Sequence, residues 1–209
     1  MSSFPAYPKT PRFSMGCLIT EKIDGTNALI SITQDEELSG PLDWCVRAGS
    51  RKRWLTLEKD NFGFARWVDE NEEQLIELLG VGTHYGEWYG SGIQRRYGLD
   101  HKRLALFDGP GRYPWAVDVD QLRENESPPD MLPTKDIDLG DAKLGVTSLL
   151  YKGGLDLVLP VLIEPQDAKT WFLPGGSVTV PGYEHTEGLI VHLQGSSGGQ
   201  RFKVVWDKR

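Results

Sequence analysis

The sequence has little cysteine and no long apolar run. Cys17 and Cys45 are the only cysteines in 209 residues, too few and too far apart for a disulfide framework or a zinc cluster, so we expect two free, buried thiols. No stretch is long and apolar enough to span a bilayer, and residues 1–12 lack the hydrophobic segment of a signal peptide. These absences predict one globular domain over residues 1–209, cytoplasmic, with no membrane partner, and monomeric.

A net positive charge is also missing. The formal charge is -7, which argues against a protein that coats nucleic acid nonspecifically, because neutralising phosphates requires an excess of cations. Basic residues are nevertheless concentrated in residues 47–53, 95–103 and 201–209. Acidic residues fill the intervals, mainly 35–37, 69–77 and 118–141. This alternation indicates a phosphate-binding cleft with an acidic back, the alternative being ordinary surface charge.

The sequence also lacks common nucleotide-hydrolysing signatures. There is no Gly-Lys-Ser/Thr phosphate loop and no cluster of histidines and acids, which makes a phosphohydrolase a poor interpretation. Internal repeats and low-complexity tracts are absent as well.

A short segment, Lys22-Ile23-Asp24-Gly25, carries most of the functional information. A lysine amine attacks phosphorus only when neutral, and nearby cations and partial burial favour that neutral form. Asp24 lies two residues after Lys22, on the same face if the strand continues. The Asp-Gly pair is equally typical of a simple turn between strands.

Further segments follow in a fixed order. They are Ser50-Arg51 with Asn61 after it, Tyr85 to Gly90 continuing to Gln94, Leu104 to Asp108, Glu187 to Val191, and Phe202 to Val205. Together with Lys22-Ile23-Asp24-Gly25, these segments resemble the successive motifs of covalent nucleotidyltransferases, the superfamily of polynucleotide ligases and capping enzymes. The resemblance runs from Glu21 to Lys208 and is greatest to phage-type ATP-dependent RNA ligases.

The resemblance implies a fold and an activity. The implied fold is an α+β, antiparallel-sheet-dominated nucleotidyltransferase (adenylation) domain of the ATP-grasp-like DNA/RNA ligase type, here without an appended OB or C-terminal domain. The implied activity joins 3′-hydroxyl and 5′-phosphate ends through a covalent lysyl-AMP, using ATP and Mg²⁺ or Mn²⁺. RNA, or a nicked duplex that contains RNA, is the implied partner, in a bacterial or phage-infected cell and in a role such as RNA repair.

The same resemblance implies residue roles. The catalytic residues would be Lys22 as nucleophile, Lys203 and Arg51, and the metal ligands would be Glu187 and Asp24. The nucleotide would be bound by Glu21, Lys22, Ile23, Asn27, Arg47, Glu87, Phe107, Glu187 and Lys203.

Residue chemistry suits these roles. The Glu87 carboxylate can accept two hydrogen bonds from a ribose diol, although it could instead pair with Arg95 or Arg96. Phe107 offers a stacking face for a purine, although a strand phenylalanine is often only core. Glu187 together with phosphate oxygens would satisfy Mg²⁺.

Two departures leave alternatives open. The second lysine of the last motif is replaced by Val205, so Lys203 would act alone or with Arg201 or Lys208. The chain ends at Arg209, where related enzymes continue. A GTP-dependent capping-type guanylyltransferase and a non-catalytic nucleotide- or RNA-binding module therefore remain as alternatives.

Periodicity predicts the elements. Residues 4–13 read as an extended, proline-punctuated segment, and residues 61–79 as a helix that Gly80 ends. Short helices are predicted at 119–124 and 140–150, with a proline-rich loop at 127–133 between them. Strands are predicted at 17–21, 28–33, 44–48, 83–87, 104–107, 157–163, 188–193 and 201–206.

Overall fold

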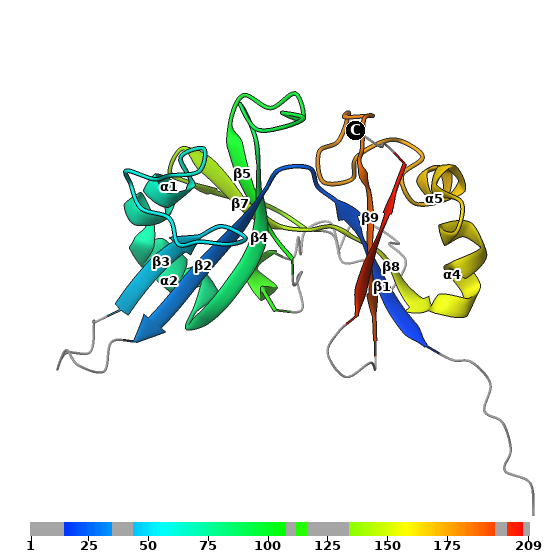
Figure 1. Cartoon of the computed structure of the whole chain (residues 1–209), viewed down its shortest axis with the longest axis horizontal. Coiled ribbons are helices and arrows are strands. Elements are labelled where there is room, and N and C mark those ends of the chain that lie inside the picture. The colour runs from blue at the N-terminus through cyan, green and yellow to red at the C-terminus, as the bar shows by residue number, and fades with distance from the viewer. Residues whose placement is uncertain (1–14, 35–43, 108–111, 117–133, 195–199, 207–209) are drawn as a thin grey trace, which may run out of the picture.

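Ten strands form two separate sheets in the computed structural model, which describes residues 15–34, 44–107, 112–116, 134–194 and 200–206. The larger sheet runs in the order β3 (Trp44–Gly49), β2 (Thr26–Gln34), β4 (Gly82–Gly90), β5 (Lys102–Leu106), β7 (Ala142–Val146) and β6 (Ile137–Leu139). The smaller sheet runs in the order β10 (Arg201–Val205), β9 (Gly188–Leu193), β1 (Gly16–Lys22) and β8 (Leu149–Gly154). Figure 1 shows the sheets side by side.

The sheet-rich α+β architecture agrees with the sequence prediction. Among the described strands, β5 and β7 pair in parallel and every other pairing is antiparallel. No helix in the described ranges is long and apolar enough to cross a membrane.

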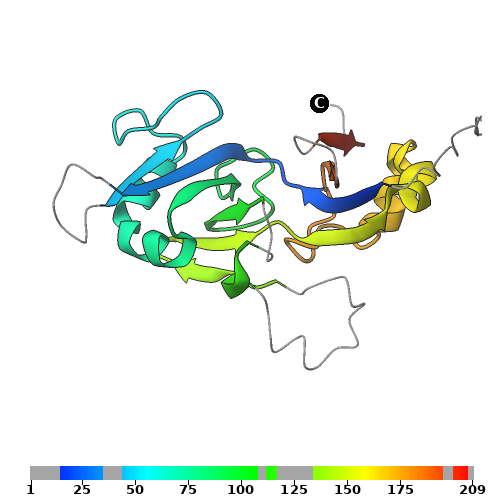
Figure 2. The ribbon, with the colours of Figure 1, turned by 90° about the horizontal axis from the view of Figure 1, so that it is seen from below.

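Two short crossovers connect the sheets. Residues 23–25 lead from β1 in the smaller sheet to β2 in the larger one, so the Asp-Gly pair does not close a hairpin. Residues 147 and 148 make the return crossing from β7 to β8. The crossovers lie together, because the backbone N–H of Glu21 donates to the carbonyl of Ser148 at 3.4 Å. Figure 2 shows both strand pairs passing between the sheets.

The predicted helix over residues 61–79 is two helices, α1 (Phe64–Glu70) and α2 (Glu72–Leu79). The buried Asn71 separates them, and its side-chain N–H donates to the carbonyl of Trp67 at 2.7 Å. An asparagine that bonds to the preceding turn competes with the regular helix. Trp67 packs on Trp88 with ring centroids 5.1 Å apart, which anchors α1 on the larger sheet. Burying one such aromatic ring contributes about 1.5–3 kcal/mol.

Two other predictions were wrong. Residues 157–163 are not a strand but fall mostly within α4 (Leu155–Leu162), which packs with α5 (Pro165–Phe172). The buried residues Leu155, Val158 and Leu162 have helical spacing, a pattern that the continuous apolar run obscured. Residues 140–150 are not a helix but the strands β7 and β8, because they pair with β5 and β1.

The two cysteines differ in exposure. Cys17 is buried as predicted, whereas Cys45 is exposed, because it lies between two β3 residues, Trp44 and Val46, that turn toward the core. The remaining described element is the short 3-10 helix η1 (Pro114–Ala116). The predictions for residues 4–13, 119–124 and 127–133 lie outside the described residues.

Candidate active site

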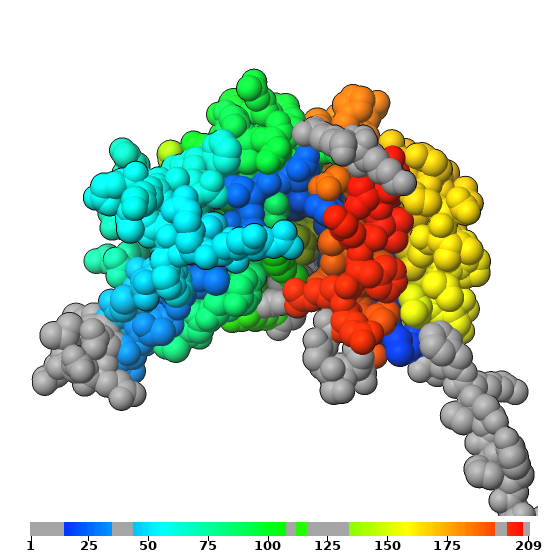
Figure 3. Space-filling model, in the orientation of Figure 1, coloured from blue at the N-terminus to red at the C-terminus, as the bar shows by residue number. Residues whose placement is uncertain are grey.

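A cleft of about 910 Å³ lies between the two sheets, at the crossovers. Figure 3 shows it as a hollow, with the loop after β3 (cyan) on one side and β10 (red) on the other. The smaller sheet contributes Thr20, Lys22, Ile190, His192, Arg201 and Lys203 to its lining. The larger sheet and its loops contribute Thr26, Asn27, Ser50, Arg51, Lys52, Arg53, Asn61, Glu87 and Phe107, and the crossovers contribute Ile23, Gly25 and Thr147.

Strand register explains why the cations of the smaller sheet face the cleft. Lys22 is level with Gly188 and Val205, and two residues along, the next row on the same face holds Thr20, Ile190 and Lys203. Directly opposed residues of antiparallel strands project from the same face of the sheet. Lys203 therefore lies on the same face as Lys22, two residue rows along the sheet, and Val205 occupies the row of Lys22 itself.

Lys22 lines this cleft and forms an ion pair with Glu187, which lies at the edge and is not itself a lining residue. Its Nζ donates to Oε2 of Glu187 at 2.7 Å, and the two side chains are 21% and 16% exposed. Glu187 immediately precedes β9, and the pairing of β1 with β9 brings it beside Lys22. The structure thus places two residues with predicted roles in direct contact.

Glu87, on β4, lies beside the lysine turn. Its Oε1 accepts a hydrogen bond from the backbone N–H of Gly25 at 3.1 Å. Burial raises the pKa of Glu87 to about 7, against the opposing influence of Lys22. A bare Cβ at Gly25 would lie 2.4 Å from the carbonyl oxygen of Trp88, so only glycine allows this close approach. The alternative that Glu87 pairs with Arg95 is not what the structure contains, since Arg95 pairs with Asp24.

Asp24 does not line the cleft; its carboxylate turns toward Arg95, whose Nε donates to Oδ2 at 2.8 Å. The Asp24 carboxylate is thus paired with Arg95, and its role as a metal ligand stays a prediction. Glu21 lines the cleft, but its carboxylate is buried and accepts the backbone N–H groups of Val178 and Thr179 at 3.1 and 3.0 Å. Burial raises the pKa of Glu21.

The predicted nucleotide-binding residues divide into two groups. Asn27 and Phe107 line the cleft as the sequence led us to expect, and so does the buried Ile23. Arg47 is not among the lining residues; its guanidinium lies 4.0 Å from the centre of the Trp54 ring, at the base of the loop that carries Arg51. Arg47 thus supports the loop, whereas Arg51 itself faces the cleft.

His192 and Thr147 in the cleft, and the contacts of Arg95 behind it, were not predicted from the sequence. His192 could have been found, because it follows Gly188 and Ile190 at alternate positions of one strand. Thr147 and Arg95 carried no local signal.

The donor groups suit a divalent metal ion that also binds phosphate. No group of three histidine, cysteine, aspartate or glutamate side chains gathers within the described ranges. Glu187 and Glu87 both interact electrostatically with one another and with Lys22. One or two carboxylates completed by phosphate oxygens form the set that Mg²⁺ prefers, so the residues fit a metal that arrives with a nucleotide.

The fold is thus a two-sheet α+β fold, with a lysine–carboxylate pair at a cleft that several cations line. A sequence model of the family described as RNA ligase matches residues 16–205, so the chain belongs to the RNA ligase family. This match confirms the resemblance to RNA ligases found in the motifs. Among proteins of curated function, none matches the sequence.

One of two similar solved structures supports the fold. The Naegleria gruberi RNA ligase R4a, as a lysine-to-alanine mutant in its apo form, matches with a TM-score of 0.52 at 16% identity. A Naegleria gruberi RNA ligase, as a lysine-to-alanine mutant with ATP and Mn, matches with a TM-score of 0.49 at 15% identity. Each match covers 91% of this chain and 49% of the other. The chain thus spans about half the length of these solved structures.

Proposed function

We propose that the chain is an ATP-dependent RNA ligase that works through a covalent lysyl-AMP on Lys22. The observation that carries the proposal is the Lys22 amine, held 2.7 Å from Glu187 in a cleft that Arg51, Arg201 and Lys203 also line. An amine in a cleft that several cations also line suits attack on a polyanionic triphosphate. Family membership supports the same reaction class.

In the first step, neutral Lys22 attacks the α-phosphorus of ATP after its ammonium has lost a proton to solvent. A phosphorus–nitrogen bond forms, the bond to the β-phosphate oxygen breaks, and pyrophosphate leaves. Lys203 and Arg51 would stabilise the charge that develops on the phosphate oxygens, since guanidinium and ammonium groups bind such oxygens strongly. A divalent metal bound by Glu187 would supply further stabilisation of that charge.

Nucleoside recognition would fall to the larger sheet. Glu87 and Asn27 are register partners on β4 and β2, and both line the cleft. Their oxygens suit the ribose hydroxyls, and the Phe107 ring offers a face for the purine. Ile23 and the backbone of Glu21 would complete this nucleoside pocket.

In the second and third steps the nucleotide is passed on and released. A 5′-phosphate oxygen attacks the AMP phosphorus and the phosphorus–nitrogen bond breaks, which frees Lys22. A 3′-hydroxyl then attacks the activated 5′-phosphate, the phosphodiester forms, and AMP leaves. The loop at residues 50–53 and the β10 cations would hold the RNA backbone along the cleft, as basic grooves do.

The test uses α-labelled ATP and Mg²⁺ or Mn²⁺, followed by denaturing electrophoresis. We expect label that survives denaturation in the wild type and is absent from Lys22→Ala, whose fold circular dichroism checks. Label from GTP alone would replace the proposal with a capping-type guanylyltransferase. Absence of label from both nucleotides would reject the covalent mechanism and leave a nucleotide- or RNA-binding module.

A further inference from the structure

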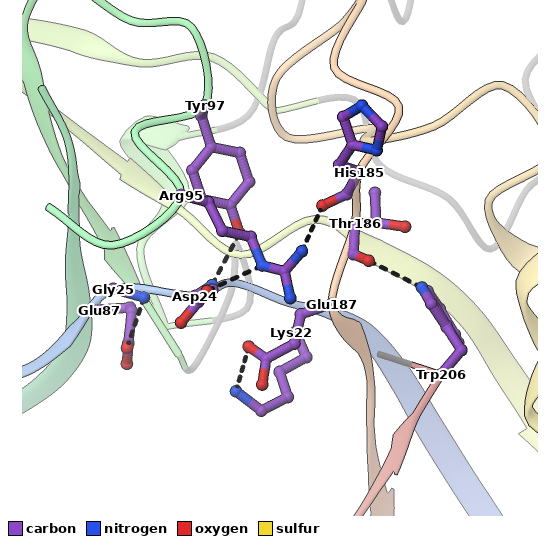
Figure 4. A network of polar contacts seen from close by, with 10 residues as sticks. All are labelled: Lys22, Asp24, Gly25, Glu87, Arg95, Tyr97, His185, Thr186, Glu187 and Trp206. Carbon is purple, nitrogen blue, oxygen red and sulfur yellow. Dashed lines mark hydrogen bonds and ion pairs between the residues drawn. The ribbon is translucent and has the colours of Figure 1, made fainter. Parts of the chain in front are cut away.

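Arg95 contacts both of the chain segments that carry the Lys22–Glu187 pair (Figure 4). Its Nε donates to Oδ2 of Asp24 at 2.8 Å, and its Nη1 donates to the carbonyl of His185 at 3.0 Å. Asp24 lies two residues after Lys22, and His185 lies two residues before Glu187. The guanidinium therefore joins the two chain segments that carry the pair.

The segment that carries Arg95 has an unusual backbone. It follows β4, and the φ angles of Gln94, Arg96 and Tyr97 are 43°, 59° and 52°. Left-handed conformations of non-glycine residues are sparsely populated and persist where the surroundings hold them. Here the fully buried Ile93 anchors the start of the segment by bridging to Gly90.

Tyr97 anchors the other end. Its ring packs against Tyr89 and Tyr183, with centroids 5.3 and 4.6 Å away. Its hydroxyl accepts the backbone N–H of Asp24 at 2.7 Å. Arg95 is thus held between two buried anchors, and Asp24 in the crossover is bound by the side chains of both Arg95 and Tyr97.

The segment before Glu187 is held from the opposite side as well. The indole N–H of Trp206 donates to the carbonyl of Thr186 at 2.8 Å, while Arg95 takes the carbonyl of the preceding His185. Consecutive carbonyls are therefore bound by different elements, which leaves little freedom for the backbone that presents Glu187.

Burial makes the Arg95–Asp24 pair sensitive to the loss of either member. The side chains are 5% and 19% exposed. Removing one partner of a buried pair leaves an uncompensated charge, whereas the intact pair mainly specifies geometry. A guanidinium suits this place because its planar fork can donate in two directions at once, which an ammonium on the same stem does not reproduce.

We propose that Arg95 is a positioning residue that sets the distance and orientation of Lys22 and Glu187; the proposal rests on the function proposed above. Arg95 lies outside the cleft lining, so it acts through the backbone that carries the pair and not through contact with the nucleotide. Its loss should slow attack on the α-phosphate and leave nucleotide affinity nearly unchanged.

The kinetic test compares Arg95→Ala, Arg95→Lys and the neighbouring Arg96→Ala, which makes the same change of charge. We expect the rate of label incorporation to fall about 10- to 100-fold in Arg95→Ala, because a displacement of about 1 Å costs about that much. The half-saturating ATP concentration should stay within about twofold of wild type. Arg96→Ala should keep the wild-type rate. Equal rates in Arg95→Ala and wild type would overturn the proposal.

Chemical rescue separates positioning from a general loss of structure. Guanidinium ion at a non-denaturing concentration should restore part of the Arg95→Ala rate, and sodium chloride at equal ionic strength should not. If Arg95→Ala does not fold, Arg95→Lys decides: it keeps the charge but loses the fork, so a wild-type rate in that variant would refute the role.

Hydrogen exchange tests the arrangement without any nucleotide. Peptides covering residues 22–26 and 185–189 should exchange faster in Arg95→Ala, or in Arg95→Lys, than in wild type and Arg96→Ala. Unchanged exchange in both peptides would reject the Arg95 link even if the protein labels with ATP. Faster exchange in a protein whose wild type takes no label would reject the proposed reaction and retain the link.

Discussion

Lys22 Nζ lies 2.7 Å from Glu187 Oε2, although 165 positions separate the two residues in the sequence. The contact depends on one strand pairing, that of β1 with β9, which sets Lys22 opposite Gly188. A cation bound by the metal-binding candidate Glu187 would compete with the Lys22 ammonium for the same carboxylate. In the proposed reaction the pair would therefore link metal binding to release of the nucleophile.

Glu187→Gln tests this link. The amide keeps the size of the side chain and removes the charge, so we expect label incorporation from ATP to fall about 100-fold at a fixed Mg²⁺ concentration. Raising the metal concentration should recover part of the rate. Glu184→Gln, at an exposed position of the same loop, is the matched control and should behave as wild type. A metal response identical in both variants would contradict the assignment.

Glu87 should make stability depend on pH. Its pKa is raised from 4.5 to about 7 in the folded protein, so the folded state binds the proton more tightly than the unfolded state. Stability from this group is fully present below pH 4.5 and is lost as the pH rises toward 7. The loss is at most about 3 kcal/mol. Urea unfolding of wild type and Glu87→Gln at pH 5 and about pH 8 measures it.

Comparison with Glu87→Gln isolates the contribution of Glu87 to the pH dependence, since the buried Glu21 is present in both wild type and variant. We expect a smaller fall in unfolding free energy between the two pH values in Glu87→Gln than in wild type. Glu77→Gln, on the exposed face of α2, provides the control for removing one carboxylate. Equal pH dependence in wild type and Glu87→Gln would contradict the raised pKa.

Arg51 and Arg47 should differ in what their loss affects. Arg51→Ala removes a cation that lines the cleft, and we expect the half-saturating ATP concentration to rise about tenfold. Arg47→Ala removes the contact with Trp54 and should lower the unfolding free energy by about 0.5–1 kcal/mol. ATP titrations and urea unfolding of both variants measure the two effects. A larger rise of the half-saturating ATP concentration in Arg47→Ala than in Arg51→Ala would show that Arg47 binds ATP directly.

Val205→Lys adds a second cation in the row of Lys22. Gly188, which has no side chain, lies between positions 22 and 205, so the new ammonium can approach a bound triphosphate. We expect the half-saturating ATP concentration to fall about three- to tenfold, about the effect of one charged hydrogen bond. Val81→Lys makes the same substitution at an exposed site before β4 and should change nothing. An unchanged or higher value in Val205→Lys would contradict the row geometry.

The sequence predicted strands where side chains alternate or border a functional motif, and their positions were confirmed for β1, β2, β3, β4, β5, β9 and β10. It failed at residues 140–150 and 157–163, where the pattern of apolar residues fits either element type. Pairing with β5 and β1 decided the first, and helical packing of Leu155, Val158 and Leu162 decided the second. Tertiary contacts override weak local preferences of this kind.

For the site, the sequence by itself determined the residue types: an amine, two carboxylates and several cations, in an order that identifies the family. Only the tertiary structure decided their partners. Lys22 pairs with Glu187 and Asp24 pairs with Arg95, while Arg47 packs on Trp54 outside the cleft lining. The physical reason is that side-chain contacts follow strand register and the two crossovers, which join residues far apart in the chain and leave no local trace.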